Sequence, residues 1–208
     1  SLEKEEEKKL APWTSAVAKI KPLLLDGKCA RTADLTDDEK AAIYDMFLLT
    51  MKPTLYVANV DEDSIADGTN KYVEIVKKYA AEEKSDVVVI CGKFEADLAE
   101  ITEEADRKDF MESVGLEESG LAVLARKAYH LMGYRTFFTG GQDECRAWTI
   151  HAGDTAPKAA GVIHTDFEKG FIRAEVIKYE DFLSYGSEAA VKEAGKMGVE
   201  GKEYIVQD

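Results

Sequence analysis

The stretch Lys52-Pro-Thr-Leu-Tyr-Val-Ala-Asn-Val-Asp-Glu62 indicates the fold more strongly than any other part of the chain. Its residues 55–58 are apolar except for one tyrosine hydroxyl, which is typical of a short buried strand. Asn59 and Glu62 follow directly. In α/β nucleotide-binding domains, ligands bind at the carboxyl ends of the strands. An amide, which donates and accepts, and a carboxylate, which only accepts, can together read the polar edge of a purine there.

Composition limits the possible classes of protein. The 208 residues suit one or two domains, and a hydrophobic content of 45% is enough for a core. The net charge of −14 argues against non-specific binding to nucleic-acid phosphates and gives no support to a DNA partner. Cys29, Cys91 and Cys145 are widely separated and fit reduced thiols in a cytosolic protein. With no signal-like segment and no apolar run near the ~18 residues that span a bilayer, we expect a cytoplasmic protein with no membrane partner.

Residues 1–50 predict a helical arm and a return helix. Trp13, Val17, Ile20 and Leu24 follow helical spacing and form one apolar stripe. Pro22 is expected to bend or end this helix, and Gly27 is a plausible stop. Thr36-Asp-Asp-Glu39 is a capping box that predicts a second helix, continuing through residue 49. The arm could be one leg of an antiparallel helix pair or an amphipathic helix that covers an ordinary core.

Residues 51–134 predict alternating strands and helices. A strand is expected at 54–60, a helix at 71–83 with Tyr72, Ile75, Val76 and Tyr79 on one face, and a second strand at 86–91. Helical patterns follow at 94–114 and 118–132. This βαβ order requires a parallel sheet with right-handed crossovers.

Residues 135–208 predict a small α+β module of the β-grasp kind. Two short strands, 135–139 and 146–150, are joined by Gly140-Gly-Gln-Asp143, which is a hairpin signal. A helix near 161–167 and strands at 171–177 and 204–206 follow. The domain boundary is expected near residues 133–135.

The second predicted strand ends in Cys91-Gly92-Lys93, a small-residue loop that would let the backbone approach a base. An Asn that ends a strand often only bonds its own backbone. The pattern N-x-x-E alone is therefore weak evidence for a ligand site, and its position after a buried strand is what favours one. No catalytic residue is predicted, and no metal ligand, because His130, His151 and His164 lack ligand spacing. The phosphate-binding pattern G-x-x-x-x-G-K-[ST] does not occur in the 208 residues.

The segment Asn59-Val-Asp-Glu62 resembles the base-recognition motif of the YchF-type Obg-like ATPases, a subfamily of the translation-factor GTPases. Most relatives in that class carry N-K-x-D, whose Asp accepts hydrogen bonds from the N1 and N2 donors of guanine. Adenine lacks both donors. The resemblance associates Glu62 in place of Asp, and Val60 in place of Lys and lying against the base, with a preference for ATP. It also implies the complete set of nucleotide-contacting residues: Asn59, Val60, Glu62, Cys91, Gly92 and Lys93.

The resemblance extends over nearly the whole chain except its highly charged start. Similar segments include Thr36-Asp-Asp-Glu-Lys-Ala-Ala-Ile43, Phe94-Glu-Ala-Asp-Leu-Ala-Glu100 and His164-Thr-Asp-Phe-Glu-Lys-Gly-Phe-Ile-Arg173. It implies an α/β fold in three parts. Residues 1–50 would form a coiled-coil arm and return helix. Residues 51–134 would form the later half of the parallel sheet of a P-loop NTPase (an OBG-type G domain). Residues 135–208 would form a TGS domain, which is ubiquitin-like, without its last strand.

The function implied by the resemblance is that of a ribosome-associated ATPase that hydrolyses ATP in preference to GTP with Mg²⁺. The phosphate loop and the metal ligands are expected outside this chain, so the chain alone is not expected to be active. The alternative is a non-catalytic β-grasp adaptor with a vestigial nucleotide domain.

Overall fold

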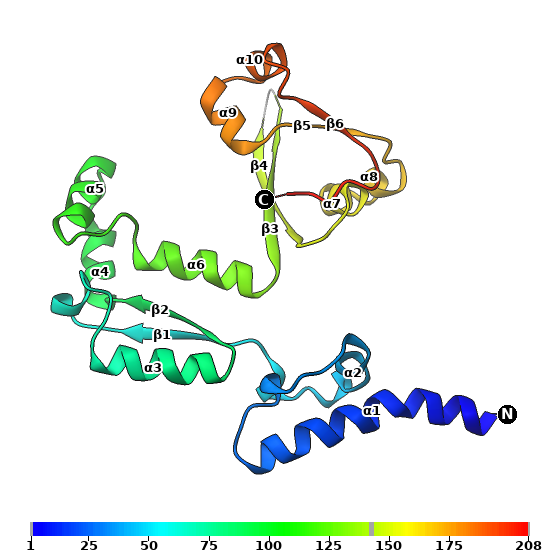
Figure 1. The fold of residues 1–208 in the computed structure, drawn as a ribbon. Coiled ribbons are helices and arrows are strands. Elements are labelled where there is room, and N and C mark those ends of the chain that lie inside the picture. Colours follow the sequence, from blue (N-terminus) through cyan, green and yellow to red (C-terminus); the bar gives the residue numbers. More distant parts are fainter. Residues whose placement is uncertain (1, 142–143, 208) are drawn as a thin grey trace. The chain divides into compact units, whose positions relative to one another are not determined.

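The computed structural model describes residues 2–141 and 144–207. The chain divides into two compact units, Ser1–Leu131 and Met132–Asp208 (Figure 1). Among the described residues, no helix combines the length and the apolar character needed to cross a bilayer.

The first unit begins with the long helix α1 (Leu2–Leu25), which contains both Pro12 and Pro22. The helix does not end at Pro22: it continues for three further residues, and the Asp26 amide still donates to the Pro22 carbonyl over 3.0 Å. The chain turns at Gly27, whose positive φ of 71° is accessible to glycine at little cost. The prediction of Gly27 as the stop is therefore confirmed.

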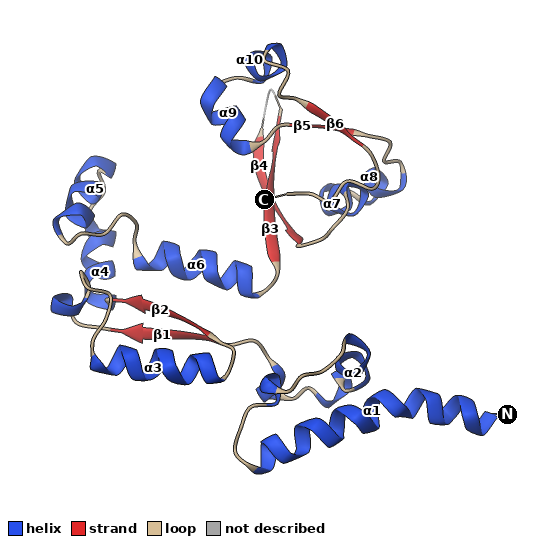
Figure 2. Ribbon diagram, viewed as in Figure 1, coloured by secondary structure: helices blue, strands red, loops and turns tan. Residues whose placement is uncertain are grey.

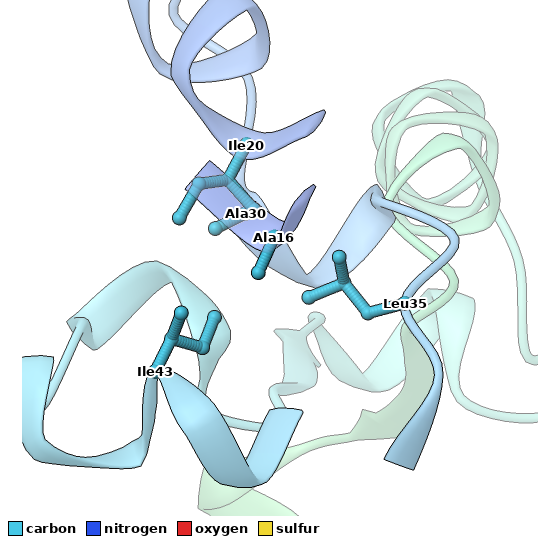
Figure 3. Close-up of a cluster of buried hydrophobic side chains, with 5 residues drawn as sticks. All are labelled: Ala16, Ile20, Ala30, Leu35 and Ile43. Atoms are coloured by element: carbon cyan, nitrogen blue, oxygen red, sulfur yellow. The ribbon is translucent and has the colours of Figure 1, made fainter. Parts of the chain in front are cut away.

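A small apolar cluster joins α1 to the segment that follows it (Figure 3). Ala16 and Ile20 of α1 pack with Ala30, Leu35 and Ile43. The predicted stripe is correct only at its centre, because Trp13 and Leu24 remain 42% and 39% exposed. The reason is that α2 (Asp37–Ala42) has six residues and covers only a short part of α1.

The predicted capping box is confirmed, since Thr36 and Glu39 bond each other's backbone amides. The length predicted for this helix is wrong. It ends at Ala42 and gives way to two 3-10 turns, Tyr44–Met46 and Leu49–Met51. Phe47 between them has a φ of 46°, a left-handed conformation that a right-handed helix cannot contain.

A parallel pair of strands forms the centre of the rest of this unit. β1 (Leu55–Asn59) pairs with β2 (Asp86–Ile90), as the βαβ pattern predicted. Helices α3 (Lys71–Glu82) and α6 (Gly120–Leu131) both pack on this pair, one on each side in Figure 2. The single helical stretch expected at 94–114 is instead two helices, α4 (Gly92–Glu100) and α5 (Glu104–Ser113).

The four residues expected on one face of α3 are not the ones that the helix buries. Val73 and Ala80 are its buried residues, while Tyr72 and Ile75 are 66% and 65% exposed. Tyr79 lies with its ring edge-on to that of Tyr56.

The second unit opens with the predicted hairpin. β3 (Tyr134–Gly140) pairs antiparallel with β4 (Cys145–His151). Residues 142 and 143 of the predicted turn lie outside the described residues. The remaining elements are two helices, a strand, two further helices and a strand that pairs with the first: α7 (Ala156–Ile163), α8 (Thr165–Lys169), β5 (Ala174–Val176), α9 (Tyr179–Tyr185), α10 (Glu188–Glu193) and β6 (Gly198–Glu200).

Two expected strands of this unit differ from the structure. The strand at 171–177 is shorter, because only Ala174–Val176 has a partner, β6, which was not predicted. The strand at 204–206 is reduced to one isolated bridge between Thr155 and Ile205. The amide of Ala156 donates to the Tyr204 carbonyl over 2.7 Å, but the chain then turns into α7, so no ladder can continue.

Candidate nucleotide-base site

The carboxyl ends of β1 and β2 lie at the same edge because the two strands are parallel. Asn59 is in register with Ile90, and the Val60 amide donates to the Ile90 carbonyl over 2.8 Å. The residues after each strand therefore start from neighbouring positions. Two side-chain bonds then connect the two loops directly.

The first of these bonds fixes the orientation of Asn59. Its Oδ1 accepts the Gly92 amide over 2.9 Å, at the start of α4. Because the oxygen is engaged with the backbone, the Nδ2 end of the amide points the other way. Among the described residues, Nδ2 has no hydrogen-bond partner. Asn59 thus presents a donor at the sheet edge.

The second bond joins Glu62 to Lys93. Glu62 is the first residue of the 3-10 turn Glu62–Ser64, and Asp61 caps this turn by accepting the Ser64 amide over 3.0 Å. The Lys93 ammonium lies 2.5 Å from the Glu62 Oε2 atom. This hydrogen bond raises the pKa of Lys93, which favours its charged form.

The other predicted residues contribute differently. The Cys91 side chain is only 2% exposed and packs with Ile65, Phe94 and Leu98, so only its backbone can face a ligand. Val60 is half-buried against the same cluster. The six predicted residues are thus brought together at one edge, but two of the side chains belong mainly to the core.

The contact between Glu95 and Gly120, which holds α6 beside this edge, was not predicted from the sequence. The buried Glu95 accepts the Gly120 amide over 2.7 Å. A Cβ on Gly120 would lie 2.9 Å from the Ile90 Cγ2 atom, so only glycine allows this approach. A glycine at a helix start was the only available signal, and nothing in the sequence connects it to Glu95. The sequence does contain a signal for the turn at Glu62–Ser64, because an aspartate such as Asp61 is a preferred capping residue.

The described residues contain no cluster of three His, Cys, Asp or Glu side chains that could hold a metal ion. This edge presents a hydrogen-bond donor from Asn59, an acceptor from Glu62 and a cation from Lys93.

A parallel α/β unit with two connected polar loops at the carboxyl edge of its strands, followed by a small α+β unit, places the chain in the class of two-part α/β proteins. The comparisons with known proteins identify the family. The family model YchF-GTPase_C, described as a protein of unknown function (DUF933), matches residues 134–208. The chain belongs to the YchF family.

Three relatives support this assignment. The "Ribosome-binding ATPase YchF" of Escherichia coli O157:H7 is 50% identical over 194 residues, which are 93% of this chain and 53% of that protein. The protein of the same name from Bacillus subtilis is 45% identical over 208 residues, covering all of this chain and 57% of that protein. The "Structure of the Schizosaccharomyces pombe YchF GTPase" has a TM-score of 0.80 and 33% identity, and covers 93% of this chain and 52% of that one. The chain thus spans about half the length of these relatives.

Proposed function

We propose that this chain is part of a ribosome-associated ATPase that binds and hydrolyses ATP in preference to GTP, and that the edge formed by β1 and β2 recognises the adenine base. The names of the bacterial relatives support the activity and the ribosome as partner. The relatives' names differ in the nucleotide, since the fission yeast structure is titled a GTPase. The choice of ATP therefore rests on the residues of the site.

The observation that carries this proposal is the double connection between the two loops, Asn59 to Gly92 and Glu62 to Lys93. It holds at one edge the Asn59 amide nitrogen and one Glu62 carboxylate oxygen, neither of which has a hydrogen-bond partner among the described residues. The Asn59 Nδ2 group can donate to N7, an acceptor that all purines carry. The Glu62 carboxylate can accept from the 6-amino group of adenine. Val60, in the place of a lysine, would contribute apolar contact to the base.

Phosphate and metal binding are assigned to sequence outside these 208 residues. The pattern G-x-x-x-x-G-K-[ST] does not occur in the chain, and the described residues offer no metal-ligand cluster. We therefore assign the Mg²⁺ ligands and the hydrolysis step to the rest of the full-length protein. The arm at residues 1–50 would act as a coiled coil and residues 135–208 as a TGS module. Both would serve as partner-binding surfaces on a cytoplasmic protein.

The test is a titration of the full-length protein with fluorescent ATP and GTP analogues. We expect tighter binding of the ATP analogue. The double variant Val60→Lys and Glu62→Asp should shift the preference towards GTP, since it restores the guanine-reading pattern. Equal affinity for both nucleotides, or an unchanged ratio in the variant, would contradict the roles assigned here. Ribosome binding without binding of either nucleotide would instead favour the adaptor alternative.

A further inference from the structure

The Lys93–Glu62 ion pair spans the candidate base site between two loops that are distant in sequence. The two residues are 31 positions apart, and the ammonium contacts only one of the two carboxylate oxygens, Oε2. The Oε1 atom remains open to a ligand, since the described residues provide no hydrogen-bond partner for it. The Glu62 side chain is 49% exposed, so a base can reach it.

Adenine and guanine make different demands on such a carboxylate. On its Watson–Crick edge, adenine offers one donor site, the 6-amino group, next to the acceptor N1. Guanine offers two adjacent donor sites, the N1 proton and the 2-amino group, next to the acceptor O6. A carboxylate satisfies two adjacent donors best with both of its oxygens, in the bidentate geometry that it also uses with arginine.

We propose that Lys93 determines the purine specificity of this site by occupying the Glu62 Oε2 atom. One oxygen then remains, which suffices for the single 6-amino donor of adenine but not for the two donors of guanine. Lys93 is a positioning residue in this scheme, because it acts through Glu62. The inference rests on the proposed function.

The competing explanation is that Lys93 and Glu62 form an ordinary surface ion pair with no influence on the ligand. The chain offers a matched control for this case. Lys77 and Glu74 on α3 form a pair at 3.1 Å with side chains 44% and 62% exposed. They lie on the helix that covers the sheet. Glu74 accepts from the Thr69 hydroxyl just before α3, but the described residues give neither side chain a bond to residues 59–62 or 91–93.

The experiment measures the affinities of ATP and GTP analogues for the full-length protein and three variants, Lys93→Met, Glu62→Gln and the double variant, with Lys77→Met as the control. Methionine keeps much of the lysine stem and removes the charge. We expect Lys93→Met to lower the ratio of ATP affinity to GTP affinity by about two- to fivefold, the size of effect typical of one exposed ion pair. The change should come mainly from better GTP binding. Lys77→Met should leave the ratio unchanged.

Two further measurements separate positioning from a general structural effect. In the Glu62→Gln background, Lys93→Met should no longer change the ratio of ATP affinity to GTP affinity, because the carboxylate through which Lys93 acts is absent. Salt should also lower the wild-type ratio between about 0.1 M and about 1 M, where the Debye length falls from about 10 Å to about 3 Å. The ratio of the Lys93→Met variant should stay constant over the same range.

The outcomes distinguish this inference from the proposed function. Suppose that the wild type prefers ATP. If Lys93→Met then leaves the affinity ratio unchanged, or changes it equally in the Glu62→Gln background, the role of Lys93 is refuted. The proposed base site is not affected by either result. If the wild type binds neither nucleotide, both proposals fail. Circular dichroism and thermal melting of each variant exclude misfolding as the cause of a lost signal.

Discussion

Arg31 and Glu83 form a nearly buried ion pair between the segment that follows α1 and the end of α3. The Nη2 and Oε2 atoms are 3.1 Å apart, and the side chains are only 14% and 9% exposed. Glu83 also accepts from the Tyr56 hydroxyl over 2.7 Å and from the Cys29 thiol over 3.1 Å. The helical arm is thus connected to the parallel sheet by a polar cluster that includes Tyr56 of β1.

Replacing Arg31 by Met should destabilise the first unit. Glu83 would keep its bonds from Tyr56 and Cys29 but lose its counter-charge, and a broken buried pair typically costs about 3–5 kcal/mol. We expect a loss of roughly 2–4 kcal/mol, because the two remaining donors still compensate part of the charge. Hydrogen–deuterium exchange of peptides from α3 and β1 would measure it. Lys77→Met, which breaks an exposed pair, should cost less than about 1 kcal/mol.

The stability of this unit should decline in acid. Hydrogen bonds from Tyr56 and then from Cys29 lower the pKa of Glu83 from 4.5 to about 2. The Lys19 ammonium, the Ser15 hydroxyl and the Thr36 amide likewise lower the pKa of Glu39 to about 2. Since both values lie below those of the unfolded chain, the stabilisation is complete above about pH 4.5 and is lost as the pH falls through about 2.

Glu83→Gln and Glu39→Gln should each flatten this pH dependence, because glutamine cannot bind the proton. Urea unfolding monitored by exchange of first-unit peptides, repeated between pH 4.5 and 2, would measure the slope. A slope as steep in the double variant as in the wild type would mean that other carboxylates control acid unfolding.

Gly120→Ala should destabilise the contact between α6 and β2. The new Cβ would lie 2.9 Å from the Ile90 Cγ2 atom and 3.0 Å from the Glu95 Oε1 atom, so one of them must move. We expect a net cost of about 1–2 kcal/mol, because overpacking exceeds the gain in helix propensity. Thermal melting would measure it. Gly201→Ala, where a Cβ meets nothing within 4 Å, is the open-space control and should change the melting temperature little.

The parallel sheet was predictable because the sequence of each strand is itself a short apolar run. Residues 86–91 are an unbroken apolar run after the first aspartate, and β2 occupies Asp86–Ile90. The capping box of α2 was equally local, since its two residues are three positions apart. The end of that helix, where Ile43 leaves the helical conformation, was not predictable from periodicity.

Contacts between distant residues were the part that no pattern revealed. Arg31 and Glu83 are 52 positions apart, and Glu95 and Gly120 are 25 apart. The partners in each pair meet only because their helices and strands pack together, and that packing depends on residues throughout the unit. The six candidate base-site residues could be named from strand order and resemblance, but the Asn59–Gly92 and Glu62–Lys93 bonds between them could not.

Asn59 offers the sharpest test of base recognition, because Asn59→Asp separates its structural bond from its proposed ligand bond. Aspartate keeps an oxygen for the Gly92 amide, so the fold should be retained, whereas its second oxygen cannot donate to the purine N7 atom. N7 is common to both purines. The affinities for ATP and GTP analogues should therefore fall together by about 5- to 150-fold, the equivalent of about 1–3 kcal/mol for an unsatisfied buried acceptor. Their ratio should stay constant, in contrast to the Glu62 variants.

Asn59→Ala is the companion variant, since it removes both bonds and should also lower the melting temperature. A loss confined to one of the two nucleotides in Asn59→Asp would place Asn59 against a different atom of the base than N7.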